Sequence, residues 1–140
     1  MAQISKLKSG SILEEKESFS RAVIVDNWIF MSLTSGRDYK SRVMPDTAVG
    51  QAENALRNVE GALQAIGSQL SDVVRSRIFI PNQSDVPAVM AFIGERFRGI
   101  DHAHCVTCSP LGGPEYLFEI ECTAYKGAGS GPQERLTISL

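Results

Sequence analysis

The chain has 140 residues, of which 43% are hydrophobic and 21% are charged, and its net charge is −2 at pH 7 with a pI of about 5.7. This length predicts one domain, which is large enough to bury a hydrophobic core without support from disulfide bonds or metals. The chain has three cysteines, and because this number is odd we expect free thiols. The acidic balance argues against nucleic-acid binding, and no apolar run long enough to span a membrane or serve as a signal peptide occurs, so we expect a cytoplasmic protein.

The N-terminal segments predict an arm and a β-hairpin. Residues 10–17 are polar and are expected to form a short edge strand or an arm. Two runs rich in β-branched and aromatic residues, 21–25 and 28–33, flank the dipeptide Asp26-Asn27. Because Asp and Asn tolerate turn geometry, residues 19–33 are predicted to form a hairpin. A charged loop, 34–44, follows it.

Two helices are predicted further along the chain. Apolar residues recur every three or four positions from Val49 to Ile66, which places them on one helical face. Asp46 is the expected N-cap of this helix, and Gly67 is expected just after its end because glycine adopts positive φ without steric cost. A second helix is expected between Asp85 and Phe97, with a proline in its first turn.

The remaining segments predict strands, and together the elements define the fold class. Residues 73–80 form a strand that a proline ends, and residues 102–124 form a strand, a Gly/Pro turn and a second strand. The order β-β-α-β-α-β-β predicts an α+β domain, with two helices on one face of a mixed sheet. We expect this domain to span residues 1–126, and residues 127–140, which begin with a Gly/Ser-rich stretch, to form a flexible tail.

An ordered set of residues spans most of the chain. Its members are Phe19-Ser-Arg-Ala-Val, Asn27, Ser32, Gln51, Ala55-Leu-Arg-Asn, Gly67, Asp72, Asp85, Phe97, Leu111, Pro114, Glu119-Ile-Glu and Ala124. No short motif among them is specific, but the ordered set over about residues 18–126 resembles the YjgF/RidA family of small trimeric proteins, many of which hydrolyse imines and enamines. The resemblance implies a chorismate-mutase-like subunit in a homotrimer, with ligand clefts between the subunits.

The resemblance also implies a reaction. In deaminating relatives a cleft arginine holds the substrate carboxylate as a bidentate pair, and a glutamate of the last strand positions or activates the attacking water. Ammonia leaves without the help of a metal or an organic cofactor. The glutamate falls on Glu119, which is therefore the expected catalytic residue.

Most of the other cleft positions depart from the family's pattern. Phe19 stands where a tyrosine is common, and Ser32 keeps the family's serine but is followed by Leu33 in place of a small glycine. Met90 takes the position of an asparagine on the second helix. A gapless alignment back from the catalytic glutamate puts His104 at the arginine's place. These five residues form the expected substrate-binding set.

The missing arginine changes the expected substrate. No residue from 101 to 123 is an arginine, and a histidine lacks the planar fork that matches a carboxylate. We therefore expect weak activity on imines that carry a carboxylate. A cation of the charged loop, Arg37 or Arg42, could replace the arginine.

Each of these assignments has a structural alternative. Glu119 could lie on a solvated strand face, and Arg75 and Arg77 could pair across the sheet with Glu119 or Glu121. His104 could be a strand residue at an interface.

Two further alternatives concern metal binding and activity. The cluster His102-Ala-His-Cys-Val-Thr-Cys108 suggests zinc, but its β-branched residues favour an extended strand, so we expect no metal site. The alternative function is a non-catalytic metabolite-binding or regulatory protein. In both cases the expected partners are a small molecule and other copies of the chain, with neither nucleic acid nor membrane.

Overall fold

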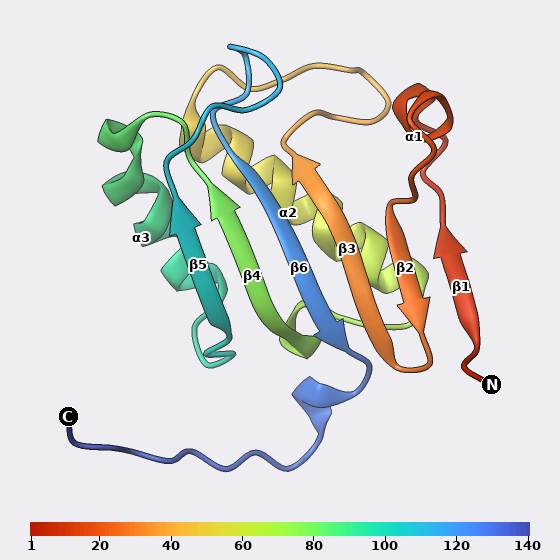
Figure 1. Cartoon of the computed structure of the whole chain (residues 1–140). Coiled ribbons are helices and arrows are strands. Elements are labelled where there is room, and N and C mark those ends of the chain that lie inside the picture. The colour runs from red at the N-terminus through yellow and green to blue at the C-terminus, as the bar shows by residue number, and fades with distance from the viewer.

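A six-stranded sheet with the order β1-β2-β3-β6-β4-β5 forms the centre of the computed structural model, which describes residues 1–140 (Figure 1). The strands are β1 Ile4–Leu7, β2 Ala22–Val25, β3 Trp28–Ser35, β4 Val73–Phe79, β5 Ala103–Thr107 and β6 Glu119–Tyr125. The helices are α1 Ile12–Lys16, α2 Ala48–Ala65 and α3 Val86–Arg96. β4 and β5 are parallel and the other neighbours are antiparallel, so the sheet is mixed. The last strand, β6, lies in the middle of the sheet between β3 and β4.

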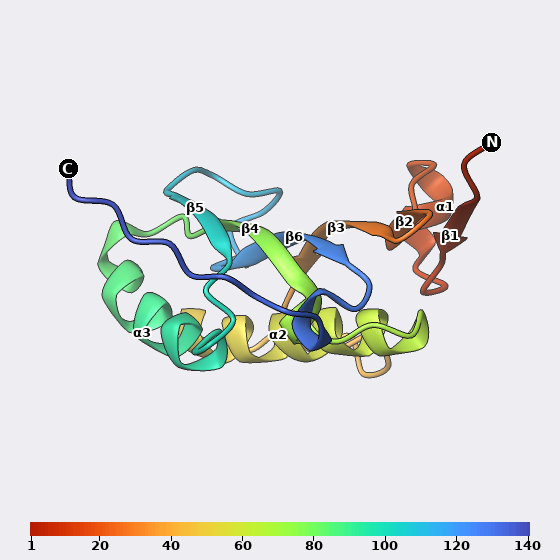
Figure 2. The same cartoon turned by 90° about the horizontal axis from the view of Figure 1, so that it is seen from below.

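Both long helices lie on one face of this sheet, as the sequence predicts for an α+β domain (Figure 2). Every second residue of the central strands points toward the helices, and Ile29, Ile78 and Ile120 are fully buried there. Leu56 and Leu63 of α2 are members of the same core, on the helix face that the sequence periodicity predicts. No helix is both long and apolar enough to cross a membrane.

The opposite face of the sheet has no helix over it, and we call it the open face (Figure 2). Trp28 and Phe30 of β3 remain 44% and 49% exposed, and Trp28 makes an edge-to-face contact with Tyr125 of β6. Arg75 and Arg77 of β4 are also exposed. An aromatic patch of this kind on a sheet marks an interaction surface.

The N-terminal arm differs from the prediction. The edge strand is β1, and most of residues 10–17 instead form the short helix α1. Gly10 has a φ of +81°, which turns the chain after β1. The buried carboxylate of Glu14 then accepts hydrogen bonds from the backbone and hydroxyl of Ser9 and holds the helix against that turn. Sequence polarity alone did not reveal this local contact.

The predicted limits of α2 are nearly right. The N-cap is Thr47 rather than Asp46, because the Thr47 Oγ1 accepts a hydrogen bond of 3.1 Å from the Gly50 N–H. Asp46 lies one residue too early for that contact. Gly67 does have a positive φ of 74° just beyond the helix, as predicted.

Part of the expected tail contacts the domain. Residues Ala128–Ser130 form a 3₁₀ turn, and the Gly129 N–H donates a hydrogen bond of 2.9 Å to the Asp72 carboxylate. Ser68 Oγ donates to the same carboxylate at 2.8 Å. Burial raises the pKa of Asp72, but hydrogen bonds from Gly129, Ser68, Gln69 and Gly127 outweigh it and hold the pKa below its usual value. The domain limit at residue 126 stays a prediction.

Candidate functional site

Glu119 begins β6, beside the last residues of β3 and β4. Its register partners are Ser35 and Phe79. Because Ile120 points into the core, strand alternation places Glu119 on the open face, on the same side as Glu121. The predicted shared face of the two carboxylates is therefore confirmed.

The two carboxylates have different surroundings. Glu121 Oε1 lies 3.1 Å from Arg77 Nη1, an ion pair across the β4–β6 register that the sequence left open as an alternative. Glu119 is half-buried and has no ion pair and no hydrogen-bond partner on its side chain. Burial raises the pKa of Glu119, and the charge of Arg21 opposes that rise. A desolvated carboxyl group that is free of partners is available for proton transfer.

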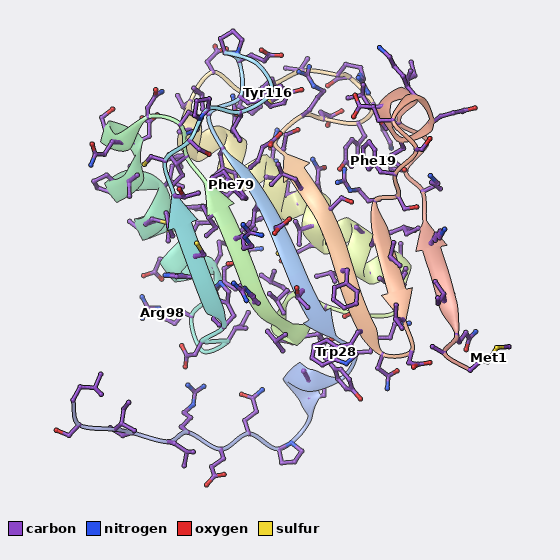
Figure 3. All side chains as sticks on the ribbon, viewed as in Figure 1. Met1, Phe19, Trp28, Phe79, Arg98 and Tyr116 are labelled. Atoms are coloured by element: carbon purple, nitrogen blue, oxygen red, sulfur yellow. The ribbon has the colours of Figure 1, made fainter.

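Three of the expected substrate-binding residues lie at the same end of the sheet as Glu119. β3 has an irregular register between Met31 and Thr34, so the bulge holds Ser32 and Leu33. Ser32 Oγ donates a hydrogen bond of 2.7 Å to the Ser20 carbonyl, so its hydroxyl supports the backbone. Leu33 is exposed, and the half-buried Phe19 lies just before β2 (Figure 3).

The other two expected residues lie on the far flank of the sheet. His104 of β5 pairs in register with the buried Ser76, so the two side chains lie on the helix-covered side of the sheet. Met90 lies on α3, packed against the edge of the core. One chain therefore does not bring His104 or Met90 to Glu119. Cys105, the next residue along β5, lies on the open face, because it is in register with the exposed Arg77.

In the histidine and cysteine cluster, His102 packs within the chain. His102 Nε2 lies 2.7 Å from Ser76 Oγ, and its ring packs on Phe97 with centroids 4.0 Å apart. Burial, followed by the nearby His104, lowers the pKa of His102. All three cysteines are free thiols, and no three His, Cys, Asp or Glu side chains converge as metal ligands would.

Arg37, one of the two loop cations considered, is held by groups other than Glu119. Arg37 Nη1 donates a hydrogen bond of 3.0 Å to the Arg42 carbonyl, and Arg37 Nη2 lies 3.7 Å from Glu115 Oε1. Its guanidinium also lies 5.7 Å from the centre of the Tyr116 ring. These contacts join the loop after β3 to the loop before β6 and leave Arg37 without a contact to Glu119.

Two polar residues of the resembling set, to which the sequence assigned no role, support this end of the sheet. Arg21 is 7% exposed, and its Nη2 donates a hydrogen bond of 2.8 Å to the Leu33 carbonyl. Gln51 is 1% exposed and holds both loops through three backbone hydrogen bonds. Neither is marked by periodicity, because each is a single polar residue beside an apolar face.

Comparisons with known proteins place this chain in one family. The family model described as Endoribonuclease L-PSP matches residues 10–126. A goat (Capra hircus) protein named 2-iminobutanoate/2-iminopropanoate deaminase is 31% identical over 113 residues, 78% of this chain and 80% of that protein. A Dermatophagoides farinae protein with the same name is 32% identical over 81 residues, 57% of this chain and 63% of the mite protein.

Solved structures agree with the family model. A Mycobacterium tuberculosis member of the YjgF/YER057c/UK114 family has a TM-score of 0.80 and 31% identity, and the match covers 88% of this chain and 99% of that chain. The chain therefore belongs to the YjgF/RidA family.

Proposed function

We propose that this protein hydrolyses small imines or enamines to a carbonyl compound and ammonia. The observation that carries the proposal is the state of Glu119, which is half-buried, without a partner, and has a raised pKa. The names of the goat and mite relatives support the same chemistry. No cofactor is needed for this reaction.

Glu119 would act as the general base. Its carboxylate takes a proton from water while the water oxygen attacks the carbon of the protonated C=N bond. The resulting carbinolamine carries a hydroxyl and an amino group on that carbon. The carboxyl group then returns the proton to the nitrogen and ammonia leaves, while the hydroxyl gives its proton to the carboxylate and becomes the carbonyl of the product. Because the base must be ionised, we expect activity to fall as the pH drops through the raised pKa of Glu119.

We further propose that the cleft forms between copies of the chain in a homotrimer. Glu119 and His104 lie on opposite sides of one sheet, so a shared cleft requires the His104 flank of a second copy. The exposed aromatic side chains of the open face, Trp28 and Phe30, supply an apolar surface for such contact. Sedimentation of the purified protein tests this, and a monomer at micromolar concentration would contradict it.

Substrate preference follows from the cationic groups present. His104 aligns with the arginine that holds the substrate carboxylate in deaminating relatives, and Arg37 is paired with Glu115. We therefore expect lower activity on imines with a carboxylate next to the C=N bond than on neutral imines. Ser32 and Leu33 would contribute backbone and apolar contacts to the bound substrate, with Phe19 and Met90 as further contacts.

The test is a competition for short-lived imines. An amino-acid oxidase generates 2-imino acids and an amine oxidase generates neutral imines, and semicarbazide trapping is followed with and without this protein. We expect the wild-type protein to slow the trapping of imines by semicarbazide, and we expect Glu119→Gln to have no such effect. Glu121→Gln is the matched control, because that carboxylate shares the open face but is paired with Arg77.

A non-catalytic metabolite-binding protein is the second candidate. The absence of an arginine between residues 101 and 123 favours it. If no imine is consumed and His104→Arg gains activity, the cleft is intact but the chemistry has been lost, and this second function takes first place. Equal activity of wild type and Glu119→Gln would refute the role of Glu119.

A further inference from the structure

A hollow of about 250 Å³ lies between the β1–β2 flank of the sheet and α2. Its lining includes three cations, Lys8, Arg21 and Arg57, together with the hydroxyl of Tyr39 and the amide of Asn58. No carboxylate lines it. Arg57 is paired with Glu53, but Lys8 and Arg21 have no carboxylate within ion-pair distance, and a positively charged lining of this kind favours anions.

Arg21 is the distinctive member of this lining. The residue is 7% exposed, yet its guanidinium has no carboxylate within ion-pair distance. Nη1 donates a hydrogen bond of 3.3 Å to the Tyr39 hydroxyl and Nη2 donates one of 2.8 Å to the Leu33 carbonyl. Nε is buried and has no partner at all. Of the five N–H donors of a guanidinium, the protein therefore uses two.

Two carboxylates near the hollow, Glu14 and Glu53, are engaged with other groups. Glu14 accepts both of its hydrogen bonds from Ser9. Glu53 forms an ion pair with Arg57 on the surface of α2, at 2.8 Å. A buried charge is normally neutralised by a partner, since an unpaired one is strongly unfavourable. Glu119 is the carboxylate whose charge acts on Arg21, and it does so from beyond ion-pair distance, so the guanidinium can take an anion from outside the chain as a direct partner.

We propose that this hollow binds a small oxyanion, a carboxylate or a phosphate group, with Arg21 as its principal ligand. A guanidinium N–H that the protein leaves free can donate a charge-assisted hydrogen bond to an oxygen of either group. Lys8, whose Nζ is held near the hollow by a hydrogen bond of 2.5 Å to the Phe19 carbonyl, supplies a second charge. Glu119 and His104 do not line the hollow, so anion binding there can be tested separately from the imine chemistry.

The test is anion titration of the full-length protein by calorimetry in a buffer of neutral zwitterions. Inorganic phosphate and propanoate are the two probes, and saturation by one or by both identifies which oxyanion the hollow takes. We expect saturable binding of at least one probe. Arg21→Gln should weaken it by about tenfold or more, because the charged hydrogen-bond donor is lost.

Two further variants keep the result interpretable. Lys8→Gln alters an exposed side chain, should fold normally, and should weaken binding several-fold. Arg98→Gln is the matched control, since this exposed arginine pairs with Glu95 and lies outside the hollow. The Arg98→Gln variant should bind the anion as tightly as the wild-type protein does. Absence of saturable binding of either probe, or binding that is unchanged in both Arg21→Gln and Lys8→Gln, would overturn the proposal.

Discussion

Gln51 is the residue whose replacement tests the architecture of this site most directly. Its Nε2 donates hydrogen bonds to the carbonyls of Pro45 and Glu115, at 2.9 and 2.8 Å, and its Oε1 accepts one of 2.8 Å from the Leu117 N–H. One buried amide thus joins α2 to the loop before it and to the loop that leads into β6. Gln51→Leu keeps much of the volume and removes all three bonds.

The expected loss of unfolding free energy follows from the three backbone groups that Gln51→Leu leaves without a partner. Two carbonyls and one N–H lose their partner, and each orphaned group costs about 1–3 kcal/mol, reduced where a loop can turn toward water. We expect Gln51→Leu to lower the free energy of unfolding by about 3–5 kcal/mol, a large part of the stability of a small domain. Urea unfolding followed by circular dichroism at one fixed protein concentration measures it, because any oligomer links stability to concentration.

Gln64→Leu is the matched control. Gln64 is exposed on the same helix, so its replacement should change the free energy of unfolding by no more than about 0.5 kcal/mol. A Gln51→Leu variant within about 1 kcal/mol of the wild type would refute the argument, since the three bonds would then contribute nothing beyond what water supplies.

Other predictions follow from buried groups. Gly36→Ala should lower the free energy of unfolding by about 1–3 kcal/mol, because the added Cβ would meet the Gln51 backbone 2.3 Å away. Gly61→Ala in α2 should raise it by about 0.5–1 kcal/mol, because the added Cβ would point into open space and alanine favours a helix. Urea unfolding midpoints measure both changes. Asp72→Asn should lower the free energy of unfolding by about 2–3 kcal/mol at neutral pH. The loss should shrink below about pH 4, because the lowered pKa of Asp72 stabilises the fold only while the carboxylate is ionised. An equal loss at all pH values would contradict this. Burial raises the pKa of Cys122 to about 12, so in a variant whose other cysteines are serine, its thiol should react with Ellman's reagent only after unfolding.

The elements whose residues repeat with a regular period were predictable. α2 follows the three-and-four spacing from Val49 to Ile66, and β6 follows the alternation that puts Glu119 and Glu121 on one side. These patterns are visible because burial against a single face imposes them. The family resemblance added the topology, which no local pattern contains.

The parts that escaped prediction depend on single contacts between distant residues. Sequence alone could not place His104 relative to Glu119, because the face of a strand residue depends on its register with the neighbouring strand, here Ser76 opposite His104. The buried state of Arg21 is likewise set by Tyr39 and Leu33, which no periodicity connects to it. The candidate catalytic carboxylate was thus identified, but the cations around it were not.

The central place of β6 has a consequence for how the chain folds during synthesis. β3 and β4 each pair with β6 and not with each other, so two halves of the sheet have no direct partner until the last strand is present. A ribosome synthesises β6 only after β1 to β5. The nascent protein therefore holds two unfinished sheet edges until that moment, and pairing over such sequence separations is slow and prone to aggregation. A truncation before Glu119 should produce no native sheet at all.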